Sequence, residues 1–112
     1  MQTRATARFV RMSPQKVRLV TRLISKRPVE EAVAILRFTN KRAARVVSKV
    51  LLSAVANAEN NYGMDRDELV VAQAVADEGP SLPKRFRAKA RGQFGTITKR
   101  TSHVTVVVDD GR

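Results

Sequence analysis

The fold is decided by two apolar arms, LVVAQAVA at residues 69–76 and, on the other side, TIT at 96–98 followed by VTVVV at 104–108. β-Branched and small apolar residues dominate both arms, which is typical of strands. Between the arms lies GPSLPKRFRAKARGQFG at 79–95, which is too long for a tight turn and too basic to be buried. A connection of this length in a compact domain is usually functional or disordered. We therefore predict a long β-hairpin that projects and carries a basic tip.

The charges in this segment point to an anionic partner. No acidic residue lies between Glu78 and Asp109, whereas the same interval contains seven cations: Lys84, Arg85, Arg87, Lys89, Arg91, Lys99 and Arg100. Cations crowded into a narrow projection repel one another, and a polyanion would relieve that repulsion. A solvated flexible loop is the alternative interpretation of the segment taken alone.

Composition bounds the class of protein. The chain has 112 residues, a formal net charge of +12 and a sequence pI near 11.4, and it contains no cysteine. We expect one domain, with a globular part at about residues 1–76 and 100–112 and an extended hairpin at about 77–99. A basic surface of this size is typical of nucleic-acid binders. The lack of cysteine excludes disulfides and thiolate metal sites and fits a reducing cytoplasm.

No membrane segment is expected. The N-terminal residues MQTR lack an apolar signal region, and no apolar run approaches the roughly 18 residues of a membrane span. A soluble, cytoplasmic protein is predicted, without a membrane partner.

Four further elements are expected before the hairpin. Residues 3–11 alternate between apolar and polar or cationic side chains, which predicts a half-buried strand with Ala5, Ala7 and Phe9 on one side. Ser13 and Pro14 predict a helix start, and the helix extends to about residue 25. A short second helix follows Pro28. A third and longest helix is expected from a cap at Asn40 to about residue 60, with an apolar stripe that makes it the core.

The helices and the first strand carry cations without acidic partners. No carboxylate stands three or four residues from Arg18 or Arg22, and the same holds for the cations at the start of the third helix. Cations that merely solubilise a helix are the alternative. With the hairpin cations, we predict these RNA-binding residues: Arg4, Arg8, Arg11, Lys16, Arg18, Arg22, Lys41, Arg42, Arg45, Lys49, Lys84, Arg85, Arg87, Lys89, Arg91, Lys99, Arg100 and His103.

The residues do not assemble a catalytic or metal site. His103 is the only histidine, so a multi-histidine metal site is impossible and a Ser-His-Asp triad would need distant partners. No glycine-rich phosphate loop precedes a helix. We expect no enzyme activity, no cofactor and no metal.

The nucleic acid is expected to be RNA rather than DNA. No helix-turn-helix, zinc-ligand or basic-zipper pattern is present, and the cations are spread over several elements, which suits an irregular folded RNA. Phe86 and Phe94 could stack on unpaired bases. Packing between the hairpin arms is an equally good interpretation of these two phenylalanines.

Five segments resemble a known family in content and order: SPQKVRLV at 13–20, TNKRAA at 39–44, SAVANAENN at 53–61, DEGPS at 77–81 and KRTSHVTV at 99–106. Together they resemble the bacterial form of the large-subunit ribosomal protein twenty-two family. The resemblance implies an α+β fold in which three helices pack on a small three-stranded antiparallel sheet with one long protruding β-hairpin.

The resemblance also implies a location and partners. The globular part would bind large-subunit ribosomal RNA near the exit-tunnel opening, beside neighbouring ribosomal proteins, without forming a homo-oligomer. The hairpin would thread inward to line the nascent-peptide path opposite ribosomal protein four. Its expected tunnel tip comprises Leu82, Pro83, Lys84, Arg85, Phe86, Arg87, Ala88, Lys89, Ala90 and Arg91. A structural, RNA-binding constituent of the large subunit is thus expected, with a free-standing RNA or DNA chaperone or regulator, or a cationic membrane-surface protein, as alternatives.

Overall fold

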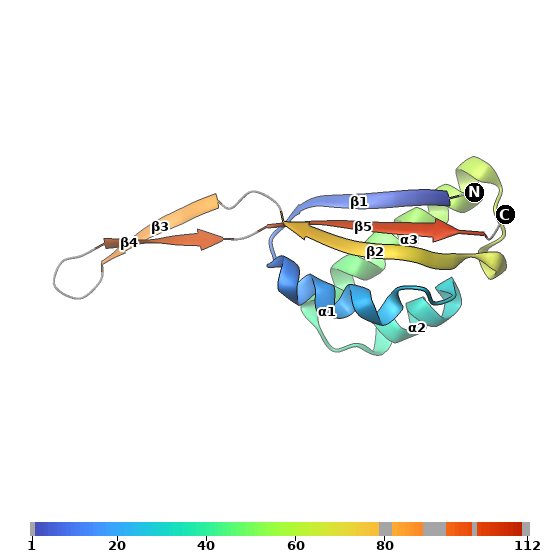
Figure 1. Ribbon diagram of the computed structural model, residues 1–112, viewed down its shortest axis with the longest axis horizontal. Helices are drawn as coiled ribbons and strands as arrows, with labels where there is room; N and C mark the ends of the chain where they lie inside the picture. The colour runs from blue at the N-terminus through green and yellow to red at the C-terminus, as the bar shows by residue number, and fades with distance from the viewer. Residues whose placement is uncertain (1, 79–81, 89–93, 100, 111–112) are drawn as a thin grey trace.

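The computed structural model describes residues 2–78, 82–88, 94–99 and 101–110, and for the two middle ranges it describes the backbone. Helices α1, α2 and α3 lie on one face of a three-stranded sheet, and a second, two-stranded ladder lies beyond one end of that sheet (Figure 1). Both chain termini are at the opposite end. The elements follow the order β1 (Gln2–Val10), α1 (Pro14–Ile24), α2 (Val29–Phe38), α3 (Arg42–Tyr62), the 3-10 turn η1 (Arg66–Glu68), β2 (Val70–Glu78), β3 (Leu82–Ala88), β4 (Phe94–Lys99) and β5 (Ser102–Asp109).

The three-stranded sheet has the antiparallel order β1-β5-β2, so the last strand lies between the first and the second. Val106 of β5 pairs with Ala5 on one side and Ala74 on the other. Val104, Val106 and Val108 are fully buried beneath the helices, as the period-two pattern of a strand with one covered face requires. The predicted pairing of the two apolar arms and the α+β class are confirmed.

Helix α3 forms the centre of the core. It packs against β1 and β5, while α1 packs against β2. Val47, Leu51 and Ala54 of α3 are fully buried in the core. Thr3 of β1 donates its hydroxyl hydrogen to the carbonyl of Ala54 at 3.4 Å. The apolar stripe predicted for this helix is therefore its covered face.

The helix ends agree with the sequence except at one cap. Pro14 opens α1 as expected, with Ser13 at the N-cap position, although the Ser13 side chain caps no backbone group. Helix α3 begins one residue later than the prediction, because Lys41 rather than Asn40 occupies its N-cap. Its C-terminal end has Gly63 in the left-handed region at φ +62°, where a glycine carries no steric penalty.

The hairpin is longer than the sequence alone indicated. The second arm was predicted as residues 96–98 followed by 104–108, with residues 79–95 as the connection between the arms. The structure also pairs β3 with β4, from Leu82 opposite Lys99 to Ala88 opposite Phe94. Seven residues of the expected tip, Leu82–Ala88, are thus part of a strand. The other three, Lys89, Ala90 and Arg91, lie outside the described residues. Proline can stand in β3 at Pro83 because the ladder has two strands and therefore only edges.

Candidate nucleic-acid interface

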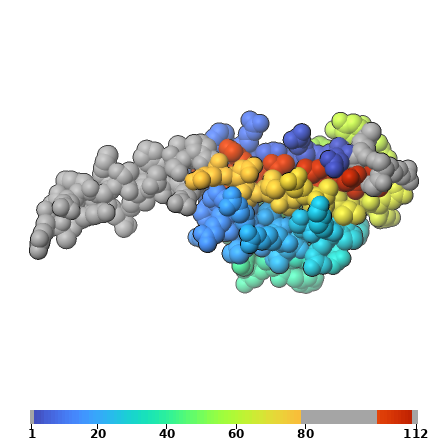
Figure 2. All heavy atoms as spheres, viewed as in Figure 1, coloured from blue at the N-terminus to red at the C-terminus, as the bar shows by residue number. Residues whose placement is uncertain are grey.

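The cations that the sequence predicted on the body are all exposed: Arg4, Arg8, Arg11, Lys16, Arg18, Arg22, Lys41, Arg42, Arg45 and Lys49. None of them forms an ion pair with another side chain that the structure describes. The ion pairs in that part of the chain join Arg27 to Glu31 at 2.6 Å and Arg66 to Glu30 at 3.5 Å. These ten cations therefore present positive charge to solvent without an ion-pair partner among the described side chains. Figure 2 shows part of this surface, where α1 and α2 lie alongside β2.

A groove of about 850 Å³ lies on this surface between the C-terminal end of α2 and the N-terminal half of α3. We call it the α2–α3 groove. Its apolar lining includes Val33, Leu36 and Leu52. Its polar lining is strongly cationic, with five positive side chains: Arg37, Lys41, Arg42, Arg45 and Lys49. The structure thus brings four predicted RNA-binding residues together with one that the prediction omitted.

The start of α3 strengthens the positive potential of this groove. No acidic residue stands in the first turn, and the Lys41 side chain makes no capping hydrogen bond. A helix N-terminus already attracts anions through its free N–H groups and its dipole. In the isolated protein, cations at this position are repelled by the positive end of the helix dipole. When a phosphate is bound, the cations and the dipole both attract it. The groove is electrostatically suited to a polyanion.

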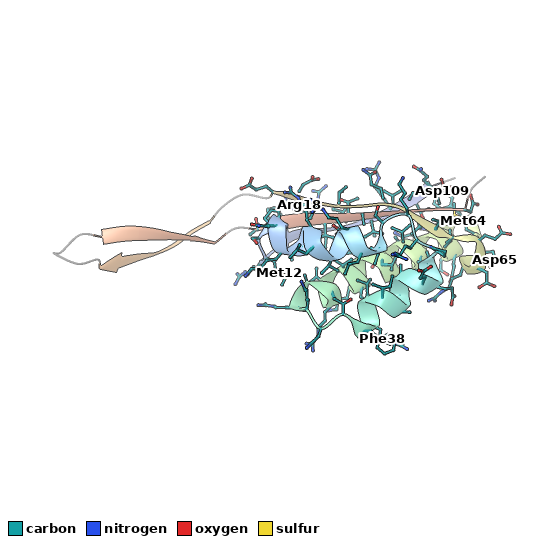
Figure 3. The ribbon with its side chains drawn as sticks, turned by 60° about the horizontal axis from the view of Figure 1, so that its bottom comes forward. Met12, Arg18, Phe38, Met64, Asp65 and Asp109 are labelled. Atoms are coloured by element: carbon teal, nitrogen blue, oxygen red, sulfur yellow. The ribbon has the colours of Figure 1, made fainter. Side chains whose placement is uncertain are left out.

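Arg37 and Phe38 are the groove residues that the sequence analysis missed. Arg37 lies in the last turn of α2, four residues before Lys41. Phe38 is 84% exposed, and its ring points outward from the end of α2, away from the sheet (Figure 3). One signal was available in the sequence, because Phe38 lies outside the stripe through Val29, Ala32 and Leu36 that α2 buries.

A second, smaller hollow of about 240 Å³ lies between α1 and the outer edge of β2, and it contains Arg18 and Arg22. Arg18 donates from Nε to the carbonyl oxygen of Ala76 at 3.0 Å, which satisfies a backbone acceptor on an edge strand. Figure 3 shows Arg18 beside β2. The two arginines therefore differ: Arg18 also holds α1 to the sheet, whereas Arg22 has no such bond among the described residues.

The open face of the sheet, on the side away from the helices, carries Arg4, Arg8 and His103. Thr3 faces α3, so the alternation of β1 places Arg4 on this open face, opposite Val107 in the register. The hydroxyls of Thr6 and Thr105 lie 3.2 Å apart on the same face. Cations are thus present on both broad sides of the body, which agrees with a ligand that wraps around it.

Phe9 is placed differently from the prediction, which put it with Ala5 and Ala7 on the covered side. The register between Ala7 and Val10 is irregular, and Phe9 adopts φ +57°. This bulge brings the ring, which is 60% exposed, into an edge-to-face contact with His103 at a centroid distance of 5.1 Å. The Phe9 N–H donates to Nδ1 of His103 at 3.2 Å. An aromatic pair therefore stands on the open face beside Arg8.

The geometry gives no support to catalysis. Nδ1 of His103 accepts a backbone N–H, and the adjacent Ser102 is fully buried with its hydroxyl donating to the carbonyl of Met12. Among the described residues no group of three or more histidine, cysteine, aspartate or glutamate side chains could hold a metal ion. In the same part of the chain, no helix combines the length and the apolar character needed to cross a membrane.

Of the hairpin cations, four have a described backbone. Lys84, Arg85 and Arg87 lie on β3, and Lys99 lies at the end of β4 opposite Leu82. The register is irregular between Pro83 and Arg85, which places Lys84 at a bulge. The remaining three, Lys89, Arg91 and Arg100, lie outside the described residues. Phe86 is opposite Thr96 and Phe94 is opposite Ala88, so the two phenylalanines are not direct partners in the ladder.

Comparison with known proteins identifies relatives over nearly the whole chain. Residues 5–109 match the family model of ribosomal protein L22p/L17e. A Thermoanaerobacter sp. (strain X514) protein named large ribosomal subunit protein uL22 is 59% identical over 110 residues, which cover 98% of each chain. A Staphylococcus aureus (strain JH9) protein of the same name is 55% identical over 112 residues, covering 100% of this chain and 95% of the relative.

Proposed function

Because the chain belongs to the ribosomal protein L22p/L17e family, we propose that its exposed cations dock it on ribosomal RNA and that its hairpin lines the nascent-peptide exit tunnel. The chain is a structural, RNA-binding constituent of the large ribosomal subunit of the cytoplasmic ribosome, where its partners are ribosomal RNA and other ribosomal proteins. It is not an enzyme. The family gives no support to a free-standing chaperone or regulator.

The observation that carries the docking proposal is the exposed cation set on the body. Ten cations there form no ion pair with a described side chain, and a folded RNA supplies phosphates on several sides at once. Each cation that contacts a phosphate releases condensed counterions, so the affinity of such an interface falls steeply with salt. The docking surface comprises the predicted residues of the body together with Arg37.

The docking proposal is tested with the purified protein and large-subunit ribosomal RNA. We expect the logarithm of the binding constant to fall linearly with the logarithm of salt concentration, by about 0.7–0.9 per phosphate contacted. Filter binding over a salt series measures this slope. A binding constant that does not change between low and moderate salt would exclude a phosphate-dominated interface.

The tunnel proposal concerns the two parts predicted from the sequence. The globular part, about residues 1–76 and 100–112, would stay on RNA near the tunnel opening, and the hairpin at about 77–99 would pass inward. The expected tip at residues 82–91 would then contact the nascent peptide opposite ribosomal protein four. Two observations support this: the β3–β4 ladder continues outward beyond the sheet (Figure 1), and the molecule measures 62 × 26 × 17 Å.

A shortened hairpin tests the tunnel proposal. Replacement of residues 85–97 by Asn-Gly would keep the pairs Leu82–Lys99 and Pro83–Thr98, with a short loop of the kind that closes hairpins. We expect ribosomes with this variant to assemble, because the removed backbone lies outside the packed body. We also expect altered macrolide sensitivity and altered stalling by nascent chains that sense the tunnel. If ribosomes that contain the variant showed unchanged macrolide sensitivity and unchanged stalling, the hairpin would serve only to anchor the protein on RNA.

A further inference from the structure

We propose that the α2–α3 groove binds an unpaired segment of RNA, in which the Phe38 ring stacks on one base while cations hold the adjoining phosphates. The proposal rests on the RNA docking described above and makes it specific for one site and one form of RNA. The cations concerned are Arg37, Lys41, Arg42, Arg45 and Lys49.

The position of Phe38 is the first argument. A single exposed apolar side chain is common on protein surfaces. Phe38, however, is 84% exposed at the rim of a groove in which five cations converge. An aromatic face beside positive charge is the combination that single-stranded RNA sites use, with bases on the rings and phosphates on the cations. A single-stranded RNA would therefore use both features of this site, with a base on the Phe38 ring and phosphates on the neighbouring cations.

The second argument is that the end of α2 is a firm support for a ring. The Thr39 hydroxyl donates to the carbonyl of Ile35 at 2.6 Å, and the Lys41 N–H donates to the carbonyl of Thr39 at 3.0 Å. These bonds fix the backbone on the C-terminal side of Phe38. Leu36, two residues before it, is buried in the core. Because the backbone is held on both sides, only the Phe38 side chain itself loses conformational freedom on binding, which favours stacking.

The third argument is the spacing of the cations. Lys41, Arg45 and Lys49 follow one another at intervals of four residues, so they lie along one side of α3. With a rise of about 1.5 Å per residue, this row extends about 12 Å along the helix. A row of this length contacts several successive phosphates rather than one isolated anion. The groove volume of about 850 Å³ is within the range of pockets that enclose ligands larger than a single ion.

The same features select against duplex RNA. Bases in an A-form helix are stacked on each other, and their faces are inaccessible to a side chain. Phe38 can stack only on a base that is splayed out of such a helix. An acidic protein segment would satisfy the cations, but it offers no flat face to the ring. Unpaired RNA offers phosphates to the cations and a base to the Phe38 ring, so we take it as the occupant. Binding of an acidic protein segment is the alternative that the experiment tests.

A fluorescence experiment tests this directly. The chain contains no tryptophan, so Phe38→Trp introduces a single indole at the proposed platform. The matched control is Tyr62→Trp, at another exposed aromatic position (57% exposed) at the far end of α3. The probes are a single-stranded oligoadenylate, an RNA duplex of equal length and polyglutamate. Anisotropy of labelled probes measures the occupancy, so that quenching is compared at equal saturation.

The proposal predicts quenching of the indole at position 38 by oligoadenylate and little by the duplex or polyglutamate, with no comparable quenching at position 62. Phe38→Ala should weaken oligoadenylate binding by roughly 5- to 150-fold, the range found for base-stacking aromatics, and change duplex binding by less than about twofold. Phe38→Tyr should restore the affinity, whereas Phe38→Leu should not.

Three outcomes would overturn the proposal. Equal quenching by all probes, or stronger binding and quenching by polyglutamate than by RNA, would show that the groove does not recognise an unpaired base. An unquenched indole at position 38 with oligoadenylate bound would place the RNA elsewhere and leave the general docking intact. Failure of the unaltered protein to bind ribosomal RNA would instead refute the docking on which the proposal rests.

Discussion

The two ends of helix α3 differ in how they are stabilised. At the C-terminal end, Gly63 turns the chain in the left-handed region, and the N–H groups of Gly63 and Met64 reach the carbonyls of Glu59 and Ala58 at 3.2 and 3.0 Å. These bonds are the pattern that satisfies the last carbonyls of a helix. The following turn is closed by Asp65, whose carboxylate accepts from the Asp67 N–H. Local interactions favour this end.

The N-terminal end has none of these features. Lys41 at the N-cap makes no side-chain capping bond, and the first turn contains no acidic residue. Cations there oppose the helix dipole by a few tenths of a kcal/mol each. One end of α3 is therefore suited to folding, whereas the other retains residues that weaken the isolated helix and suit a phosphate ligand. Substitutions at each end should therefore affect stability and RNA affinity differently.

The largest effect is expected when the cationic end is neutralised by changing Lys41, Arg42, Arg45 and Lys49 together to glutamine. If each contacts one phosphate, the affinity for large-subunit ribosomal RNA should fall by roughly 100-fold or more at moderate salt, and the salt slope should become shallower by about 3. Stability should hold or rise, because like charges four residues apart repel. Filter binding and urea denaturation measure the two quantities. If the folded variant bound ribosomal RNA as tightly as the unaltered protein, the cationic end of α3 would have no role in RNA binding.

The next effect is expected at the C-terminal end, with Gly63→Ala. Nothing lies within 4 Å of a Cβ added there, so no clash arises and the cost comes from the backbone at φ +62°. We expect the free energy of unfolding to fall by about 1 kcal/mol, with a smaller loss for Gly63→Asn because asparagine tolerates this region better. RNA affinity at constant folded fraction should not change. Loss of affinity would show that this end also contributes to binding.

A third variant, at the cationic end, should raise stability and lower RNA affinity. Lys41→Ser supplies the missing N-cap oxygen, so the free energy of unfolding should rise by about 0.5–1 kcal/mol. RNA affinity should fall severalfold because a phosphate contact is lost. Lys41→Ala is the matched control, since it removes the same charge without adding a cap. Equal stability of the serine and alanine variants would mean that the helix end is not limited by its cap.

The sequence contained most of the fold because its local patterns agree with the final packing. Their β-branched and small apolar composition identified the arms that became β2 and β5, and period-two alternation identified β1. Ser13-Pro14 marked the start of α1. Strand β3 was not predicted as a strand, because its charged composition carries no apolar alternation. Its pairing with β4 depends on the partner strand rather than on its own sequence.

The site was predictable as a set of residues but not as an arrangement. Exposure of the body cations followed from charge and helical spacing, whereas the meeting of Arg37 with Arg45 depends on how two helices pack. The bond from Arg18 to Ala76 joins residues 58 positions apart, so no local pattern reveals it. Phe9 was misplaced because a bulge inserts a residue without changing the composition of the strand.

The smallest effects come from the same substitution at two places, Arg45→Ala at the cationic end of α3 and Arg66→Ala in η1, the turn that follows its C-terminal end. Arg45 lines the α2–α3 groove, so its loss should lower RNA affinity by roughly three- to tenfold and reduce the salt slope by about 0.7–0.9. Arg66 is surrounded in sequence by Asp65, Asp67 and Glu68 and lies 3.5 Å from Glu30, an environment that disfavours phosphate. Its loss should change affinity by less than about twofold.

Stability should show the reverse order. The Arg66–Glu30 pair is largely exposed, with 40% and 66% of the two side chains accessible, and pairs of this kind contribute about 0–1 kcal/mol. Arg66→Ala should therefore cost up to that amount, and a double-mutant cycle with Glu30→Ala should give a coupling energy of the same small size. Arg45→Ala should change stability by less than about 0.5 kcal/mol. If both alanine variants lost the same affinity, net charge rather than position would govern RNA binding, and the contrast between the two ends of α3 would have no functional meaning.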